Sequence, residues 1–224
     1  MCGRFIQTTD ADVLAAIYQI PLPFSLMLRY NAAPTQELAV IRRVDPDAPR
    51  EVAHLRWGLV PSWAKPGKLP TLINARSETA AEKPSFKRAL ARRRCLVLTD
   101  GWYEWLREDK VKRPFVFRRR DRAPFVYAGI WERWSRGDAP VESFSILTTQ
   151  ANATMEKVHH RMPVVVDAAH QDLWLDPEMT DVSQLMSLLG PSAAEDWEAT
   201  EVVPKVNKVH NQGPELLEPV GDPA

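Results

Sequence analysis

The chain has 224 residues, of which 45% are hydrophobic and 26% charged, the composition of an ordinary globular protein with room for a sizeable core. It contains no apolar run of the roughly 18 residues that a membrane span needs, and no apolar run after Arg4 resembles a signal peptide, so we expect a cytoplasmic protein with no membrane partner. The 29 Lys and Arg residues balance the 29 Asp and Glu residues, and net charge alone therefore does not indicate a nucleic-acid-binding protein.

Apolar runs and their periodicity predict a chain in which strands outnumber helices. In chain order, we expect a helix at Asp10–Tyr18, a strand at Glu51–Val60, a helical stretch at Ser77–Arg93 interrupted by Pro84, strands at Cys95–Leu98, Trp102–Leu106, Pro114–Phe117, Phe125–Trp131 and Ser143–Thr149, a helix at Asn152–Val158, a strand at Pro163–Val166 and a helix at Thr180–Leu189. Consecutive strands broken by occasional helices predict an α+β protein whose mainly antiparallel β-sheet is curled or barrel-like and is decorated by helices. We expect one domain over residues 1–217 and a flexible tail at 218–224.

The first candidate for chemistry is Cys2, because a thiolate is a strong nucleophile. Cysteine is small enough for methionine aminopeptidase to remove Met1. One residue would then carry a thiol and an α-amine, the latter with a pKa of about 7.7 to 8.0. Such a 1,2-aminothiol condenses with an aldehyde to an imine, and the thiol then closes a thiazolidine ring. A lone cysteine near a chain terminus is more often incidental, and only Gly3 and Arg4 beside it favour the reactive interpretation.

The pair Asp100-Gly101 lies between two apolar runs and predicts a hairpin turn, with the segment from Trp102 to Trp105 on the return strand. Alternation of side chains places Glu104 on the same face as Trp102. Aromatic neighbours would raise the pKa of this carboxyl toward a value that suits general acid or base work. An exposed acid on a surface strand explains the pattern equally well.

Histidines and amides supply further candidates. His159 and His160 directly precede Arg161, at the mouth of a predicted strand, where catalytic groups tend to lie. Asn74 could donate to an oxyanion or a sugar oxygen, and Arg76 could bind a phosphate. For each residue alone, a structural role is the more common one.

Charge is distributed unevenly along the chain. Residues 162–204 hold nine acidic side chains and no Lys or Arg, whereas basic residues cluster at Phe86–Arg94 and Arg107–Arg122. Such clusters can hold a polyanion, but solvated helix and strand faces look the same in sequence. Two cysteines, Cys2 and Cys95, and no zinc-finger spacing argue against a disulfide framework, a metal site or a cofactor.

Six motifs, taken in order, strongly resemble the SRAP family, the abasic-site processing proteins also called SOS-response-associated peptidases. They are Met1-Cys2-Gly3-Arg4-Phe5, the run from Trp57 to Trp63, Asn74-Ala75-Arg76-Ser77-Glu78-Thr79, Asp100-Gly101-Trp102-Tyr103-Glu104-Trp105, Val158-His159-His160-Arg161-Met162-Pro163, and Val206-Asn207 with Asn211. The resemblance spans nearly the whole chain. One departure is His160, which stands where many members of the family carry an acid.

The resemblance implies a DNA-damage role in which Cys2 forms a covalent thiazolidine with the ring-opened sugar of an abasic site in single-stranded DNA. By the same resemblance, the catalytic residues would be Cys2, Asn74, Glu104 and His159. Arg4, Arg76 and Arg161 would hold phosphates, with Trp63 and Trp105 as stacking surfaces. We expect a monomer that associates with the nucleoid when bound to DNA. The resemblance also implies lyase-like chemistry and, from the family name, a peptidase that acts on its own N-terminus. With only Met1 before Cys2, such autoprocessing is dispensable, since an aminopeptidase suffices.

Two other classes remain open. An N-terminal-nucleophile amidohydrolase or cysteine peptidase would use the same Cys2 with a nearby histidine but would need no basic groove. A non-catalytic single-strand binder would use Trp57, Trp63 and Trp105 as stacking surfaces and would keep full function without the thiol.

Overall fold

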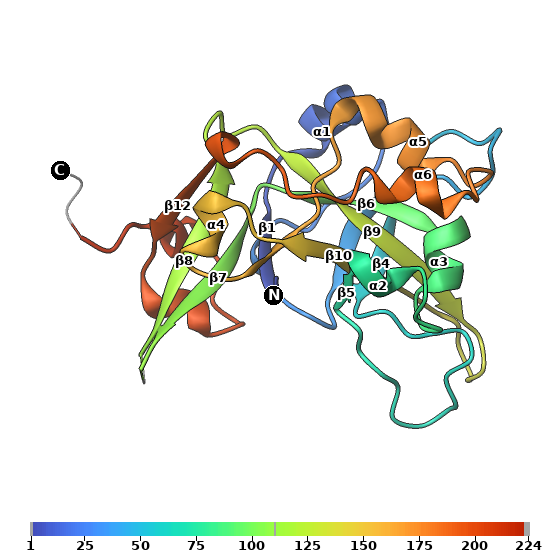
Figure 1. The fold of residues 1–224 in the computed structure, drawn as a ribbon, viewed down its shortest axis with the longest axis horizontal. Coiled ribbons are helices and arrows are strands. Elements are labelled where there is room, and N and C mark those ends of the chain that lie inside the picture. Colours follow the sequence, from blue (N-terminus) through green and yellow to red (C-terminus); the bar gives the residue numbers. More distant parts are fainter. Residues whose placement is uncertain (1, 110, 222–224) are drawn as a thin grey trace.

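The computed structural model describes residues 2–109 and 111–221, which form two β-sheets side by side with short helices around them (Figure 1). The strands are β1 (Arg4–Gln7), β2 (Arg29–Ala32), β3 (Glu37–Arg42), β4 (Glu51–Trp57), β5 (Asn74–Arg76), β6 (Arg94–Thr99), β7 (Gly101–Glu108), β8 (Val111–Arg119), β9 (Phe125–Trp134), β10 (Val141–Gln150), β11 (Arg161–Pro163) and β12 (Trp197–Glu201). The helices are α1 (Ala11–Tyr18), α2 (Ser77–Ala80), α3 (Lys87–Arg92), α4 (Ala153–Glu156), α5 (Gln171–Leu175) and α6 (Val182–Met186), with single 3-10 turns η1 (Ala168–His170), η2 (Ala194–Asp196), η3 (Pro204–Asn207) and η4 (Pro214–Leu217).

One sheet closes into a barrel. Its strands follow the order β10-β4-β3-β6-β9, and β9 pairs with β10 to complete the circle. The pairs are antiparallel except where β10 runs parallel to β4 and to β5. Beyond the barrel, the end of β10 is flanked by β5 and β11. The α+β fold with a barrel-like sheet is therefore confirmed, with a local parallel element that the sequence did not indicate.

The second sheet, β12-β8-β7-β1-β2, is antiparallel throughout, and β1 carries the start of the chain into it. The predicted hairpin at Asp100-Gly101 is wrong, because β6 pairs within the barrel and β7 pairs with β1 and β8. Asp100 instead forms a corner at which the chain passes from one sheet to the other, and its carboxylate accepts hydrogen bonds from Thr8 and Thr9. A Cβ at Gly101 would lie 2.6 Å from the Phe117 carbonyl oxygen, so glycine is needed at this corner.

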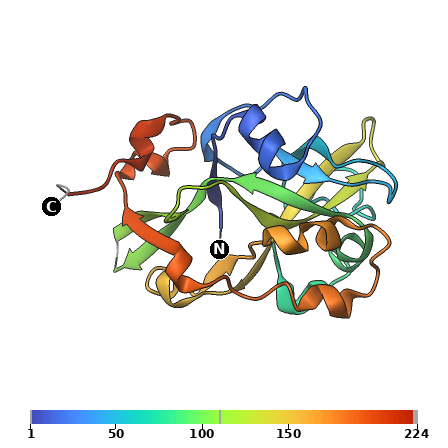
Figure 2. The same ribbon diagram turned by 90° about the horizontal axis from the view of Figure 1, so that it is seen from above.

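Basic and acidic segments that are far apart in the sequence pair with each other in the fold. The acidic strand β12 lies antiparallel to the basic strand β8, beside the hairpin of β7 and β8 (Figure 2). Arg113 donates two hydrogen bonds to Glu201, at 2.8 and 2.5 Å, and Arg122 forms an ion pair with Glu198. Three of the eight cations at 107–122, Arg113, Arg119 and Arg122, therefore form ion pairs with acidic residues of the chain, so the whole cluster cannot be counted toward polyanion binding.

The chain is still attached to the fold beyond residue 217. Val202 and Pro219 form an isolated bridge, and the backbone N–H of Val220 donates to the Glu201 carbonyl at 2.9 Å. Residues 222–224 of the predicted tail lie outside the described residues. The flexible tail and the single domain over 1–217 stay predictions, and these bonds hold the chain to the fold as far as residue 220.

Candidate active site

Cys2 lies directly before β1 with its side chain only 1% exposed, packed in an apolar cluster with Phe5, Trp57 and Trp102. Its Sγ lies 3.8 Å from the Arg4 carbonyl oxygen. Burial raises the pKa of the thiol, and the negative charge of nearby Glu104 raises it further. The thiol is therefore held neutral in this pocket, and a proton acceptor is needed before the sulfur can react.

Asn74 fixes the backbone of the cysteine. It begins β5, where it lies opposite Ile146 of β10, and its Nδ2 donates to the Cys2 carbonyl oxygen at 2.8 Å. The Asn74 Oδ1 atom is buried and accepts no hydrogen bond from the residues that the structure describes. A buried polar atom of this kind is costly unless a ligand or water satisfies it, so this oxygen can accept a hydrogen bond from either.

Glu104 lies on β7 and is 6% exposed. Its strand neighbour Trp102 belongs to the apolar cluster of Cys2, whereas Tyr103 packs in a separate cluster on the other face. This arrangement confirms the predicted alternation. Burial raises the pKa of the Glu104 carboxyl above its usual range, which makes the carboxylate a stronger proton acceptor than an exposed one.

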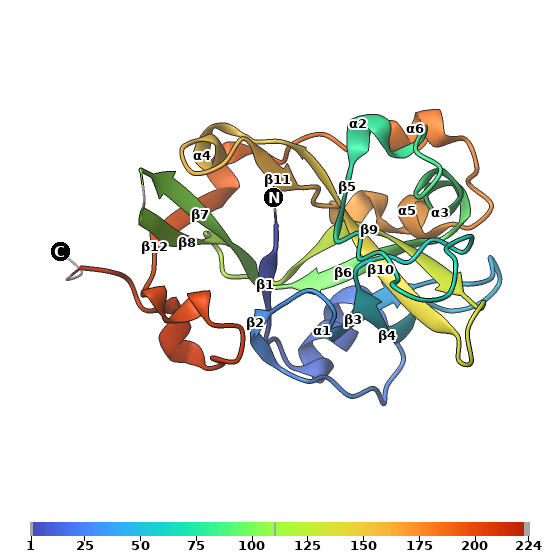
Figure 3. The ribbon, with the colours of Figure 1, turned by 90° about the horizontal axis from the view of Figure 1, so that it is seen from below.

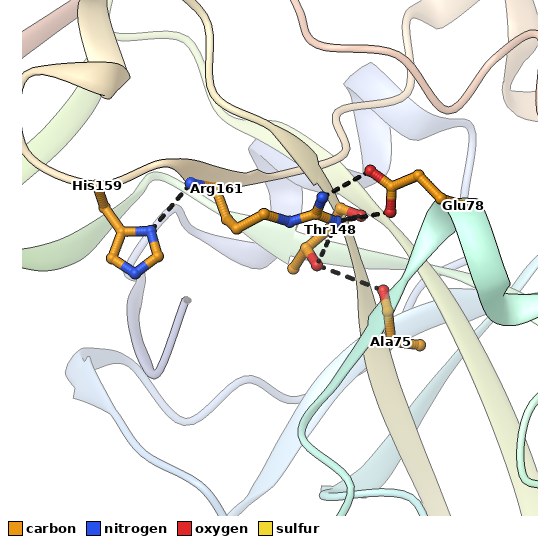
Figure 4. A network of polar contacts seen from close by, with 5 residues as sticks. All are labelled: Ala75, Glu78, Thr148, His159 and Arg161. Carbon is orange, nitrogen blue, oxygen red and sulfur yellow. Dashed lines mark hydrogen bonds and ion pairs between the residues drawn. The ribbon is translucent and has the colours of Figure 1, made fainter.

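His159 follows α4 and is oriented by the backbone. The Arg161 N–H donates to its Nδ1 at 3.0 Å (Figure 4). Because Nδ1 accepts, the neutral ring carries its proton on Nε2. Burial lowers the pKa of His159 to about 4, and the charge of His160 contributes in the same direction. The imidazole is therefore a neutral N–H donor at physiological pH.

His160 stacks on His159 with ring centroids 4.4 Å apart and an interplanar angle of 21°. It is more exposed than His159 and lines the same cleft. The second histidine of the pair therefore lies at the site itself and packs against the candidate catalytic ring.

Arg161 points away from the cleft into the protein. Its guanidinium forms a two-pronged ion pair with Glu78 of α2, at 2.6 and 2.9 Å, and donates to the Thr148 carbonyl at 2.5 Å (Figure 4). The Arg161 side chain is 9% exposed and that of Glu78 is 43% exposed. Contact between Arg161 and a phosphate stays a prediction, and it would require this ion pair to open.

An open cleft of about 960 Å³ is lined by Glu104, His159 and His160, whereas Cys2 and Asn74 are not among its lining residues. Its walls come from β1, the hairpin of β7 and β8, the end of α4 and the turn η3, and they include Arg4, Glu104, Trp105, Arg107, Lys112, Glu156, Lys157, His159, His160 and Asn207. Cationic side chains outnumber carboxylates on these walls, so the cleft suits a polyanion. The Arg4 guanidinium carbon lies 6.0 Å from the centre of the Trp105 ring.

The comparisons with known proteins identify the family. Residues 1–209 match the sequence model described as SOS response associated peptidase (SRAP). The chain belongs to the SRAP family. It is 39% identical to "Abasic site processing protein YoqW" of Bacillus subtilis, over 97% of this chain and 99% of that protein. It is 34% identical to "Abasic site processing protein YedK" of Escherichia coli, over 98% and 100%.

A solved structure supports the fold as well. The crystal structure of a protein from Bacteroides thetaiotaomicron matches this SRAP chain with a TM-score of 0.85 and 26% identity, covering 98% of this chain and 100% of that one. The match covers nearly the whole of both chains, so it includes both sheets.

The SRAP motif residues divide into those that the structure brings together and those that it does not. Asn74 contacts Cys2, while Glu104, His159, Arg4 and Trp105 line one cleft. By contrast, Trp63 lines a separate hollow with Pro84, Arg88 and Arg136. Arg76 is the last residue of β5 and is exposed. The roles of Trp63 and Arg76 in DNA binding stay predictions.

Sequence reasoning missed three cations of the SRAP cleft, Arg107, Lys112 and Lys157. The first two were visible only as members of the basic cluster at 107–122, and the hairpin of β7 and β8 is what turns them toward the cleft. In the described part of the chain, no group of three or more His, Cys, Asp or Glu residues is arranged to hold a metal ion. Over the same residues, no helix has the length and apolar character of a membrane span.

Proposed function

We propose that this SRAP chain processes abasic sites in DNA by bonding covalently, through Cys2, to the ring-opened sugar in single-stranded DNA. The names of its relatives support the substrate. The observation that carries the proposal is the environment of Cys2, whose backbone is held by Asn74 beside the buried carboxyl Glu104. Cations on the cleft walls would hold the strand that delivers the sugar.

The chemistry begins with removal of Met1, which frees the α-amine of Cys2. The amine adds to the C1′ aldehyde of the open sugar and forms an imine with release of one water molecule. The thiol then adds across the C=N bond: sulfur bonds to C1′, and the thiol proton ends on nitrogen. The product is a thiazolidine, and the complete sequence releases one water with no oxidant, reductant or metal.

Three side chains have roles that follow from their surroundings. Glu104, whose pKa is raised by burial, would take the proton from the thiol or amine and return it during ring opening and imine formation. His159, neutral with its proton on Nε2, would donate a hydrogen bond to a sugar oxygen. Asn74 would hold Cys2 and accept from a sugar hydroxyl through its buried Oδ1.

The test is to incubate the purified protein with single-stranded DNA that contains an abasic site and to look for an adduct that survives denaturation. Intact mass reports loss of Met1 and gain of DNA together. Cys2→Ala should abolish the adduct, whereas Cys95→Ala, which alters an equally buried cysteine in the barrel, should retain it.

Four results would overturn the proposal. The first is an absence of adduct with wild-type protein, and the second is an adduct that persists in Cys2→Ala. The third is release of amine from amide or peptide substrates without any dependence on DNA, which would indicate an N-terminal-nucleophile hydrolase. Full protection of abasic DNA by Cys2→Ala would instead indicate a non-covalent binder.

A further inference from the structure

Asn31 of β2 connects the two ends of the chain at the edge of the cleft. The side chain is fully buried. Its Oδ1 accepts a hydrogen bond from Arg4 Nη1 at 2.8 Å. Its Nδ2 lies 3.1 Å from the carbonyl oxygens of Val206 and Lys208 and 3.2 Å from that of Asn211. One amide therefore joins the strand of the candidate nucleophile to a segment near residue 210.

We call residues 202–217 the clasp. Figure 3 shows this red part of the ribbon alongside β2. Its Val206 is buried against Ile6 and Tyr103 of the second sheet. Gln212 holds the clasp to Asn31 from the other side, since its Oε1 accepts from the Asn31 N–H at 3.1 Å and its Nε2 donates to the Asn31 carbonyl at 3.2 Å.

The clasp orients two side chains of the cleft. Arg4 Nη1 donates to the Val206 carbonyl at 3.0 Å as well as to Asn31, so both oxygens that hold the guanidinium depend on the Asn31 amide. Asn207 Oδ1 accepts a hydrogen bond from Trp105 Nε1 at 2.6 Å. Within the described residues, both bonds of Arg4 use Nη1, which leaves Nη2 and Nε to meet a ligand in the cleft.

We propose that Asn31 is a positioning residue for the binding of DNA. It orients the Arg4 guanidinium through a direct hydrogen bond, and it orients the Trp105 indole indirectly, by holding the clasp. The ligand of the oriented guanidinium is a phosphate of a single strand, and that of the indole is a nucleobase face. This inference rests on the proposed function for the identity of the ligand. It adds a residue that touches neither the DNA nor the reacting atoms.

The experiment measures equilibrium binding of single-stranded DNA with a tetrahydrofuran abasic analogue, which has no aldehyde and cannot react. Asn31→Ala should weaken binding about tenfold, the effect of one oriented charge-assisted hydrogen bond. It should also lower the salt slope, log Kd against log salt, by about 0.7, the value for one lost phosphate contact on a single strand. A purely structural defect would weaken binding without changing that slope.

Two further variants separate the effect of Asn31 on Arg4 from its effect on Trp105. Arg4→Gln should also lower the salt slope by about 0.7. The double variant with Asn31→Ala should show the same slope as Arg4→Gln alone. Asn207→Ala removes the partner of the indole but no cation, so binding should weaken a few-fold at an unchanged slope. Gln7→Ala is the matched control, because Gln7 is a buried amide that bonds to backbone atoms of Ala39 and Leu98, and its loss should leave the slope intact.

The role of Asn31 is overturned if Asn31→Ala leaves the salt slope unchanged, or if its effect on the slope adds in full to that of Arg4→Gln. Should Asn31→Ala fail to fold, Asn31→Ser keeps a hydroxyl in the buried site but is too short to span Arg4 and the three carbonyls, and the same outcomes apply. Adduct formation is scored separately with aldehyde-bearing DNA. Its failure in wild type, with binding intact, would overturn the proposed chemistry and leave the role of Asn31 standing.

Discussion

The ion pair between Arg161 and Glu78 leads to a prediction that loss of either partner destabilises the fold, for a different reason in each case. The Arg161 side chain is 9% exposed and the Glu78 side chain is 43% exposed. Removing Glu78 therefore leaves a buried cation without a counter-ion, whereas removing Arg161 leaves a carboxylate that is in contact with water. The pair is bidentate, but the exposure of Glu78 screens it. We expect Glu78→Ala to cost about 2 kcal/mol, below the range for removing one partner of a fully buried pair.

Arg161→Met should cost about 2 to 3 kcal/mol, because it also leaves the Thr148 carbonyl without its donor. The double variant should lie within about 0.5 kcal/mol of Arg161→Met, since Glu78 then has no cation left to lose. Urea unfolding of the four proteins at pH 7.5 gives the cycle. Arg119→Met, which breaks a bidentate pair with the exposed Asp121, is the control and should cost less than about 1 kcal/mol.

The hydrogen bond from Arg161 lowers the pKa of Glu78, so its contribution is present above the unfolded glutamate pKa of about 4.3 and is lost as pH falls through the lowered folded value. The coupling energy from the cycle should therefore shrink at pH 3. Fully additive single costs at pH 7.5 would refute the reasoning. So would a cost below about 0.5 kcal/mol for Glu78→Ala, because both results would mean that the buried guanidinium needs no counter-ion.

Three other predictions concern the site and the corner beside it. Asn74→Ala should slow adduct formation about tenfold or more in single-turnover assays while binding of the unreactive analogue changes little, because the lost bond orients Cys2; equal losses in rate and affinity would contradict this. The ring of His159 should titrate near its folded pKa of about 4 by NMR, so stability should fall as pH drops from about 6.5 toward that value, and a normal titration near 6.5 would remove the case for a neutral donor. Gly101→Ala should cost about 2 to 4 kcal/mol in thermal unfolding, because its Cβ would meet the Phe117 carbonyl, and a near-neutral change would show that the corner can shift.

Apolar runs predicted several of the buried strands, but not β3 (Glu37–Arg42), which was missed although its four central residues are apolar and buried. The runs Cys95–Leu98 and Phe125–Trp131 lie in β6 and β9, which form part of the closed barrel. The strands at Arg29–Ala32 and Trp197–Glu201 were missed because they are the edges of the second sheet and carry polar side chains. One of these edges, β2, carries Asn31, the residue that we propose positions Arg4 and Trp105.

The candidate site was also predictable only in part. The motifs identified Cys2 and Glu104, and side-chain alternation placed Glu104 on the correct face of its strand. The burial of Arg161 could not be read from the sequence, because its partner Glu78 is 83 positions away and meets it only where β5 and β11 flank β10. Local patterns report which side chains one element presents, while ion pairs between distant segments depend on the packing of whole sheets.

The bond between Arg4 and Val206 joins positions 202 apart in the chain, which sets an order of events during synthesis. A growing chain exposes its first strand long before residue 206 has been made, so Cys2 and Arg4 leave the ribosome without their final partners. Met1 can be removed during this interval, while the first residues are still accessible to an aminopeptidase. On the proposed function, the geometry that holds DNA would form only once the clasp has been made, so a nascent or truncated polypeptide would carry Cys2 without a finished cleft beside it.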